Sequence, residues 1–447
     1  MSQLAAPGAK KPMSIGRIAF ASLVGTTIEW YDFFIYGTAA ALVFSHAFFP
    51  NVDPTAGTLA SFATFAVGFI ARPVGGFLGG HFGDKIGRKV MLVATLLITG
   101  IATFLIGLLP TYEQIGIAAP LLLVILRFFQ GLGVGGEWGG AVLIAVEHAP
   151  ADKRGFYGSL PQLGVAAGLS LGTIMFAIVG TLPDDAFQAW GWRIPFLISA
   201  LLVGVGLVIR ARIDETPVFK EMQAKKTVQR LPILDAIKQY PVRIVQATMV
   251  SFVAILIFFI VTVFTLSYAT NKLGVSRNTI LIAIVVVAIG EFITLPAWSA
   301  LSDRIGRRPV FLIGAGFTAL FAFPYFWLID TGNTVAIFVA FLAIWLVGHA
   351  ASYGVSAAFL MEMFPAEMRY SAASVSYQLS SIIAGGFTPM ITTALLAWSG
   401  DKSWSVGLYL FAGAMISVIG GLLAIETRKR ADRSPGHARD LTSTSTV

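Results

Sequence analysis

The chain has 447 residues, of which 56% are hydrophobic and only 12% are charged; it carries a formal net charge of +8 and has no cysteine. A soluble globular protein carries roughly 25% charged residues, so this composition excludes that class and indicates a membrane protein. The lack of cysteine excludes disulfides and thiolate metal sites. The basic residues gather in short loops between apolar runs, which is a topology signal and argues against a nucleic-acid partner.

Apolar runs of about 20 residues, the length of a membrane-spanning helix, recur along the whole chain. Runs such as Leu92–Leu109 are too long and continuous for the alternating strands of a β-barrel. The first run is also too long for a signal peptide. We therefore predict an all-α membrane protein with 12 transmembrane helices at 18–46, 57–81, 90–109, 119–146, 156–180, 190–210, 244–270, 278–301, 309–328, 334–361, 371–398 and 404–425.

Twelve spans place both termini on one side of the bilayer. If that side is the cytoplasm, only four of the 31 Lys and Arg residues lie outside and two lie within spans, which leaves 25 in cytoplasmic segments. This excess is the one expected for cytoplasmic termini. The predicted organisation is a cytoplasmic tail (1–17), a six-helix bundle (18–212), a basic linker (213–243), a second six-helix bundle (244–426) and a cytoplasmic tail (427–447).

Three landmarks occur twice in the same order, which indicates two homologous, pseudo-symmetric halves. Gly83–Lys89 reads GDKIGRK, and Ser302–Arg308, 219 residues later, reads SDRIGRR. The segment from Glu147 to Arg154 has the same Glu–Pro–Arg spacing as that from Glu362 to Arg369. A Glu–Thr pair follows the sixth and the twelfth span, at 215–216 and 426–427.

The turn Gly80–Lys89 fits G-x-x-x-D-x-x-G-R-[KR], and on this motif the chain resembles the major facilitator superfamily. Further segments are similar to its metabolite:H+ symporter family, which includes shikimate, α-ketoglutarate, citrate and proline/betaine transporters. These segments are EWYDF (29–33), RPVGG (72–76), RFFQG (127–131), GGEWGG (135–140), GWRIPF (191–196) and DETP (214–217). The resemblance implies a monomeric inner-membrane symporter for a small organic anion, which uses the proton gradient and no cofactor.

Two arginines fall within predicted spans, where a charge is costly and points to function. Arg72 lies 12 residues before Asp84, so it stands about 18 Å from the charged turn, near the middle of a bilayer core roughly 30 Å thick. Arg127 enters the fourth span from the opposite side. A buried guanidinium binds carboxylates bidentately, so both arginines are candidates for holding a substrate anion. The alternative is a permanent ion pair that only fixes helix packing, with Glu29, Asp32 or Glu137.

Glu29 and Asp32 are three residues apart and share one face of the first span. When two carboxylates lie close together and away from water, one of them readily keeps a proton. The first candidate for proton coupling is Asp32, followed by Glu137 and Glu29. A structural salt bridge is an equally good interpretation.

Glu291 lies 12 residues before Asp303, as Arg72 lies 12 residues before Asp84. At this matching depth Glu291 is expected either to pair with Arg72 across a central cavity or to titrate as a second site. His349, deep in the tenth span, can donate to an anion or titrate, although a lone histidine there can also be a packing residue. Other candidates for the substrate lining are polar or aromatic: Tyr36, Gln130, Trp138, Gln162, Tyr353, Tyr377 and Gln378.

Paired charges at the cytoplasmic helix ends are interpreted as a gate. The candidates are Asp84 with Arg88, Glu147 with Arg154, Asp303 with Arg307, and Glu362 with Arg369. Exposed pairs contribute little individually, but a network formed in only one state biases a two-state equilibrium. Topology alone explains the basic residues but not the aspartates or the glycine spacing. In the fifth span, Gly164, Gly168 and Gly172 form a ridge that permits close helix contact.

The sequence has no P-loop, H-E-x-x-H or G-x-S-x-G motif, so we expect no direct use of ATP, no metal site and no enzyme activity. The leading hypothesis is a proton-coupled symporter for a small organic acid, working by alternating access between the two bundles. The alternatives are a proline/betaine osmolyte symporter, a transport-inactive receptor with the same fold and a membrane-embedded enzyme.

Overall fold

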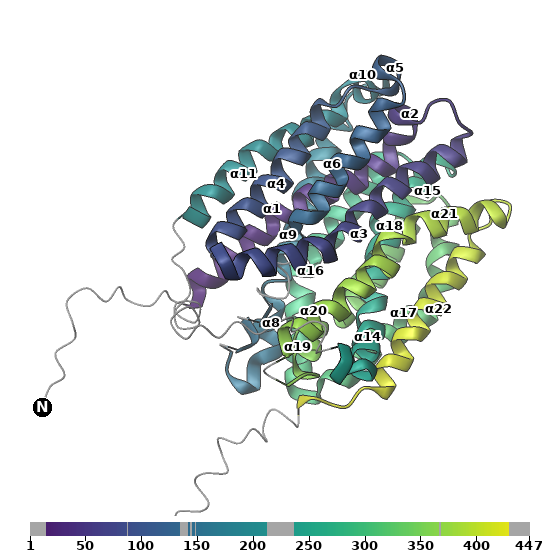
Figure 1. Ribbon diagram of the computed structural model, residues 1–447. Helices are drawn as coiled ribbons and strands as arrows, with labels where there is room; N and C mark the ends of the chain where they lie inside the picture. The colour runs from purple at the N-terminus through teal and green to yellow at the C-terminus, as the bar shows by residue number, and fades with distance from the viewer. Residues whose placement is uncertain are drawn as a thin grey trace, which may run out of the picture.

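The computed structural model describes residues 15–86, 88–134, 142–143, 145–147, 149–211, 237–365 and 368–428. Throughout these residues the regular structure is helical. The helices run roughly along one common direction in Figure 1, with the first half of the chain (purple to blue) at upper left and most of the second half (green to yellow) at lower right. Much of the predicted linker 213–243 lies outside the described residues.

The first half contains long helices joined by short turns and small helices. Its elements are α1 (Ile15–Leu42), α2 (Phe44–Phe48), α3 (Pro54–Ile86), α4 (Arg88–Leu108), α5 (Tyr112–Ile115), α6 (Ala118–Val134), η1 (Ala151–Lys153), α8 (Arg154–Ser159), α9 (Leu163–Val179), α10 (Asp184–Ala189), η2 (Gly191–Arg193) and α11 (Ile194–Ala211).

In the second half, three long rods contain π-helical segments, η3, η4 and η5. The first two continue directly into the next helix, whereas a bend at Phe387 separates η5 from the helix that follows it. π-helical turns are rare and occur frequently at functional sites. The elements are α14 (Pro241–Phe259), η3 (Ile260–Phe264), α15 (Thr265–Asn271), α16 (Arg277–Ile305), α17 (Arg307–Asp330), α18 (Thr334–Ala343), η4 (Ile344–His349), α19 (Ala350–Glu362), α20 (Arg369–Ser380), η5 (Ser381–Gly386), α21 (Thr388–Trp398) and α22 (Trp404–Leu423).

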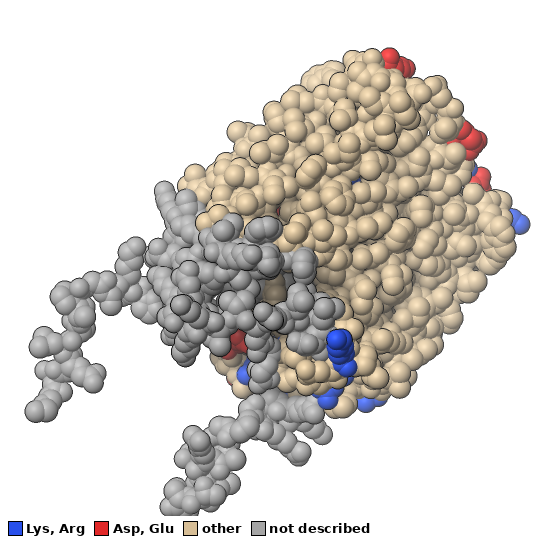
Figure 2. All heavy atoms as spheres, in the orientation of Figure 1, with Lys and Arg blue, Asp and Glu red and all other residues tan. Residues whose placement is uncertain are grey.

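The described residues contain nine helical rods that are long and apolar enough to cross a membrane. The shorter apolar helices Val93–Leu108 and Ala118–Val134, together with α1, bring the number of spans to the 12 that the sequence predicts. Each predicted span overlaps one of them. Charged side chains on the face shown in Figure 2 gather at the two ends, and the belt between them is almost free of charge. This pattern is the one expected of a surface that lies in lipid.

Each half forms its own bundle. In the first, α1 packs on α9, and α3 and α4 pack on α6; in the second, α22 packs on α14 and α17, and α19 packs on α16 and α17. The halves meet where α9 packs on α16 and where α3 packs on η5 and α21. These two seams enclose the side chains that the sequence analysis singled out.

The predicted glycine ridge on α9 is confirmed. A Cβ atom at Gly168 would lie 2.7 Å from the Thr27 carbonyl oxygen and 2.8 Å from the Tyr31 nitrogen. A Cβ at Gly164 would lie 2.7 Å from the Thr26 Cβ. Only glycine lets α9 approach the backbone of α1 this closely. The ridge therefore fixes the position of α1, which carries Glu29 and Asp32.

Candidate functional site

Arg72 is buried in the middle of α3 and is surrounded by aromatic rings. Its Cζ lies 4.2 Å from the ring centre of Phe33, 4.6 Å from that of Phe69 and 5.3 Å from that of Trp30. Cation–π attraction compensates part of the cost of burying the guanidinium. Its Nε and Nη2 have no hydrogen-bond partner among the described residues. Arg72 therefore has donor capacity that this state leaves unused.

Three ionisable side chains lie near Arg72, and they come from both halves: Tyr377 on α20, Glu29 on α1 and Tyr353 on α19. Glu29 is buried, at 4% exposure, so its attraction to Arg72 acts in a medium of low dielectric constant. An ion pair between Arg72 and Glu29 stays a prediction. The two tyrosines show that Arg72 faces the seam between the halves.

Arg127 on α6 is fully buried and packs against the other side of this region. Its Nη1 donates to Gln130 Oε1 at 2.5 Å, and its Cζ lies 4.0 to 4.8 Å from the ring centres of Tyr36, Phe33 and Phe65. A Cβ at Gly68 would lie only 2.5 Å from Arg127 Nε. This nitrogen is thus enclosed by α3. Arg127 Nε and Nη2, like the same atoms of Arg72, have no hydrogen-bond partner among the described residues. A role of Arg127 in anion binding stays a prediction.

Gln130 joins three helices. Its Nε2 donates to the Asp32 carbonyl oxygen at 3.1 Å and to Thr103 Oγ1 at 2.8 Å, while its Oε1 accepts from Arg127. Tyr36 is also fully hydrogen-bonded, because its hydroxyl donates to Thr64 Oγ1 at 2.7 Å. In this state, these two predicted lining residues connect neighbouring helices.

Asp32 is 1% exposed, and neither carboxylate oxygen has a hydrogen-bond partner among the described residues. A nearby candidate donor, the Thr103 hydroxyl, donates instead to the Thr99 carbonyl oxygen at 2.8 Å. A buried carboxylate without a donor is costly as an anion. Glu137 and Trp138, which the sequence placed beside this group, lie outside the described residues.

Glu291 does not pair with Arg72, so that prediction is wrong for this state. Its Oε1 lies 3.0 Å from His349 Nδ1, and its Oε2 accepts a hydrogen bond from Trp345 Nε1 at 2.9 Å. The contact between Glu291 Oε1 and His349 Nδ1 is close but does not have hydrogen-bond geometry. Equal depth in the bilayer did not predict the partner of Glu291, because this side chain contacts residues of its own bundle.

Gln162, Tyr353 and Tyr377 lie at the seam between the halves. Gln162 Nε2 donates to the carbonyl oxygens of Tyr353, at 3.0 Å, and Gly354, at 3.4 Å. Tyr377 interacts with Tyr353 and with Ser381 at the start of η5. Gln378, the next residue of α20, is half-buried. The predicted lining residues of the second half are thus brought together opposite Arg72.

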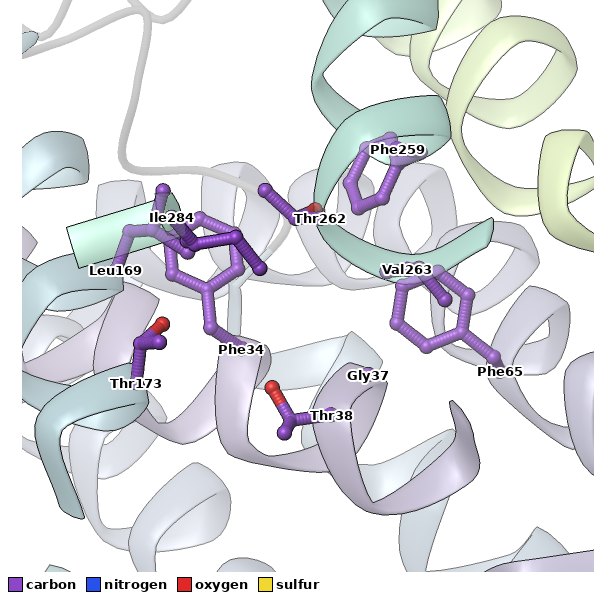
Figure 3. Close-up of a pocket in the computed structure, with 10 residues that line it drawn as sticks. All are labelled: Phe34, Gly37, Thr38, Phe65, Leu169, Thr173, Phe259, Thr262, Val263 and Ile284. Carbon is purple, nitrogen blue, oxygen red and sulfur yellow. The ribbon is translucent and has the colours of Figure 1, made fainter. Parts of the chain in front are cut away.

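A small cavity lies between the halves, beside the aromatic cluster of Phe33, Phe65 and Phe69 (Figure 3). Threonine hydroxyls and aromatic rings from both halves line it, and its lining contains no charged residue. The lining residues are Phe34, Gly37, Thr38, Phe65, Leu169, Thr173, Phe259, Thr262, Val263 and Ile284. Phe259 also packs on this aromatic cluster, because its ring centre lies 5.2 Å from that of Phe69. The cavity therefore lies next to the rings around Arg72, with the Phe259–Phe69 contact between them.

Several of the predicted gate residues form a network at the bundle end where α16 ends and α17 begins. Arg307 Nη1 lies 2.6 Å from Asp303 Oδ1, and its Nη2 lies 3.3 Å from Glu362 Oε1. Asp303 also accepts hydrogen bonds from the backbone nitrogens of Gly155, at 2.8 Å, and Phe156, at 2.9 Å, in α8 of the other half. This carboxylate thus connects the two halves.

The other predicted gate pairs have different partners from those expected. Arg369 Nη1 lies 3.4 Å from Glu147 Oε1 in the other half, whereas Glu362 contacts Arg307, and Arg154 Nε has no partner among the described residues. Asp84 and Arg88 lie at the end of α3 and the start of α4, but their side chains are outside the described residues. The charges are thus shared across the seam rather than kept within each repeated segment.

The glycine in the repeated turn has a physical explanation in the second half. Gly306 adopts φ +113°, a region that favours glycine, and a Cβ there would lie 2.6 Å from Glu426 Oε2. The Glu426 carboxylate accepts from the backbone nitrogens of Arg307 and Arg308, each at 3.0 Å, and so caps α17. Thr427 donates to Glu362 Oε2 at 2.6 Å. The repeated Glu–Thr landmark therefore belongs to the network, which spacing alone did not indicate.

Sequence reasoning missed Arg277, which it treated only as an external loop charge. At the opposite end of the bundle, Arg277 on α16 donates to the carbonyl oxygens of Gly180 and Leu182 and lies 2.5 Å from Asp184 Oδ1. Its Cζ also lies 4.2 Å from the ring centre of Phe187. All four partners belong to the first half. The two halves are therefore joined at both ends, and no motif distinguished Arg277 from other loop cations.

Two family models match the chain, one to each half: "Sugar (and other) transporter" over residues 18–231 and "Major Facilitator Superfamily" over residues 247–446. The inner membrane metabolite transport protein YhjE of Escherichia coli is 43% identical over 94% of this chain and 96% of its own. The chain belongs to the major facilitator superfamily. The resemblance seen in the sequence is thereby confirmed, and the protein is a multi-pass membrane transporter rather than an enzyme.

Other relatives of this major facilitator transporter carry more specific names. The shikimate transporter of Escherichia coli is 41% identical over 92% of this chain and 95% of its own, and the proline/betaine transporter of the same organism is 36% identical over 92% and 83%. Among solved structures, a partially occluded inward-open xylose transporter from Escherichia coli superposes with a TM-score of 0.72, at 19% identity, over 93% of this chain and 98% of that chain. That last likeness establishes the shared fold alone.

Proposed function

We propose that this transporter is a proton-coupled symporter that imports a small organic acid across a bacterial inner membrane, with both termini in the cytoplasm. The observation that carries the proposal is Arg72, a buried cation at the seam between the halves with two nitrogens that lack a hydrogen-bond partner within the described part of the chain. A substrate carboxylate can accept from these nitrogens in a bidentate geometry. The protein named a shikimate transporter, a relative at 41% identity, supports an acidic substrate.

Charge balance in the first half links the anion to a proton. Among the described residues its centre holds two arginines, Arg72 and Arg127, and two carboxylates, Glu29 and Asp32, so it is neutral when all four are charged. An arriving carboxylate adds one negative charge to a site of low dielectric constant, where an uncompensated charge is expensive. Protonation of Asp32, whose carboxylate has no hydrogen-bond partner in the described ranges, restores neutrality. Anion and proton then bind together and cross together.

Alternating access follows from the contacts at the two ends. The Asp303 contacts with α8 and the Arg277 contacts with the α9–α10 segment tie the halves together on opposite sides. Opening one side requires breaking one set while the other persists, which is a two-state rocking about the central site. No cofactor enters this scheme, since the proton gradient supplies the energy.

A second candidate function is symport of proline or betaine, which the relative at 36% identity favours. Quaternary ammonium groups bind aromatic cages, but the cage of Trp30, Phe33 and Phe69 already holds the Arg72 guanidinium. A betaine would have to find another cationic subsite. The acid is therefore the better fit.

A ligand screen followed by a transport assay tests the proposal. Thermal-shift measurements with shikimate, dicarboxylates, proline and glycine betaine should show stabilisation by an acid, because a ligand that binds the native state raises its apparent stability. In proteoliposomes a pH gradient, acid outside, should then drive accumulation of that acid. Stabilisation by betaine alone, or accumulation that ignores the gradient, contradicts the proposal.

The Asp32→Asn variant tests the proton step separately. Asparagine cannot release a proton, so the variant should exchange labelled for unlabelled acid at a rate within about threefold of the parent protein, yet lose at least tenfold of its gradient-driven accumulation. Normal accumulation by Asp32→Asn removes Asp32 from the scheme. Loss of exchange together with accumulation assigns Asp32 to structure or binding instead.

A further inference from the structure

A second buried ionisable group lies in the other half, apart from the arginine site. Glu291 and His349 are each 2% exposed, and Glu291 Oε1 lies 3.0 Å from His349 Nδ1. Trp345 Nε1 occupies the other carboxylate oxygen of Glu291 at 2.9 Å. One carboxylate oxygen of Glu291 thus faces the imidazole and the other faces the indole.

The surroundings of this pair are apolar and aromatic. The His349 ring lies between those of Trp345 and Tyr353, with ring centres 4.5 and 5.1 Å away, and Phe258 of α14 lies at 5.8 Å. Water is displaced from this environment, so electrostatic interactions are strong and unpaired charge is costly.

The charged groups of the packed helices lie elsewhere. Helices α9 and α18 carry no charged side chain, and the only one on α14 is Arg243, near its first turn. Those of α17 are Arg307 and Arg308 at its start and Asp330 at its end, all bonded to other groups. Tyr353 is the titratable neighbour of His349. The other charged groups of the two helices that carry the pair lie at their ends: Arg277, Asp303 and Arg304 on α16 and Glu362 on α19. Helix α8, which packs on both, carries Arg154 at its first position.

Neutrality of the pair requires one proton in addition to the imidazole Nε2 proton. With that proton, the pair is an imidazolium and a carboxylate with zero net charge; without it, a net charge of −1 remains in the aromatic pocket. An apolar pocket disfavours the net charge of −1, and water that enters the pocket weakens this preference. The π-helical segment η4 places Trp345 and His349 on the same carboxylate, and a shift in its register would separate them.

Tyr353 connects the pair to the arginine site. Its ring stacks on His349, and its side chain lies near Arg72 of the other half. A substrate anion on Arg72 and a proton on the pair are thus separated by one tyrosine. The arrival of one changes the electric field at the other.

We propose that the Glu291–His349 pair is a second proton-binding site of this transporter, distinct from Asp32 and sensitive to substrate at Arg72. The proposal rests on the proton-coupled function proposed above. It adds a proton that the second half carries, and so predicts that the two halves contribute separately to coupling.

Two measurements test the pair, and the first does not depend on transport. In ¹⁵N-histidine-labelled protein in lipid nanodiscs at pH 7, the NMR signal of His349, identified by its loss in His349→Gln, should be that of an imidazolium. In Glu291→Gln, where the amide oxygen can still accept from Trp345, it should change to a neutral imidazole. A neutral His349 in the parent protein overturns the proposal even if transport is proton-coupled. So does a His349 signal that is unchanged in Glu291→Gln.

The second measurement is accumulation of the acid in proteoliposomes. His349→Gln and Glu291→Gln should each lower gradient-driven accumulation at least tenfold and keep exchange within about threefold. His46→Gln, at an exposed histidine of α2, is the matched control and should match the parent protein. Normal accumulation in both variants overturns the proposal and leaves coupling to Asp32. If the parent protein itself ignores the gradient, the proposed function fails, while the NMR result still decides whether the pair holds a proton.

Discussion

The two halves place opposite charges at the same depth and satisfy them in different ways. In the first half, Arg72 stacks on aromatic rings and lies near Glu29; in the second, Glu291 contacts His349 and Trp345. Had Arg72 paired with Glu291, every transport cycle would have to break a buried ion pair between the bundles, which costs several kcal/mol. Because each half neutralises its own charge, the halves can separate without that cost.

The two halves also differ in the geometry of their backbones. In the described residues the π-helical segments η3, η4 and η5 all belong to the second half, and they lie next to the cavity, to Glu291 and to α3 respectively. The first half instead fixes its geometry by glycine contacts such as that of Gly168 with α1. The comparison suggests a rigid anion-binding half and a more adaptable half that carries a proton.

The largest effect is expected from removing the cation of the first half. Arg72→Gln should lower uptake of the acid about 100-fold, since hydrogen bonds to a charged group contribute up to about 3 kcal/mol. Arg127→Gln is the matched comparison, and it should lower thermal stability more than it changes KM, because its guanidinium is enclosed by rings and α3. Equal effects of both variants on KM would place both arginines in the binding site.

The next effect tests the rigidity of the first half. Gly168→Ala inserts a methyl group against the backbone of α1 and should destabilise the protein by about 2 kcal/mol, seen as a lower midpoint in a thermal unfolding assay in detergent. Gly204→Ala on α11 is the control, because no atom lies within 4 Å of the added Cβ. If Gly168→Ala unfolds like Gly204→Ala, the close contact of α1 and α9 does not hold the site.

A smaller effect is expected at the contact between Asp303 and α8. Asp303→Asn weakens the contacts with Gly155, Phe156 and Arg307, and should shift the equilibrium about tenfold, or roughly 1.4 kcal/mol, toward opening at that end. Spin-label distances between α8 and α16 should lengthen. Unchanged distances would show that the pair serves only to fix topology.

The smallest effect is expected at the opposite end. Arg277→Gln keeps some hydrogen bonding to the carbonyl oxygens of Gly180 and Leu182, and its partner Asp184 is 84% exposed, so solvent screens the ion pair. The shift toward opening at that end should be about two- to threefold, measured with labels on α10 and α15. A shift as large as that of Asp303→Asn would make Arg277 the stronger of the two locks.

Much of the architecture could be predicted because membrane helices follow local rules. Apolar runs of about 20 residues located all 12 spans, and repeated turns located the two halves, because each span must satisfy its own backbone in lipid. The depths of Arg72 and Glu291 also follow from helical rise alone. Burial of Asp32, Arg127 and Gln130 follows from their places within spans.

Only the tertiary structure decided which charges meet. Depth along a helix leaves rotation and neighbours open, so it did not show that Glu291 turns toward His349 or that Arg369 contacts Glu147. The roles of Trp345, Arg277 and Glu426 depend on residues at least 54 positions away in the chain, at distances that no local pattern encodes. The sequence by itself determined how many helices cross the membrane and how deep each charge lies, because burial in lipid is a local requirement. The packing of the helices determined the partners, because an electrostatic contact depends on position in three dimensions.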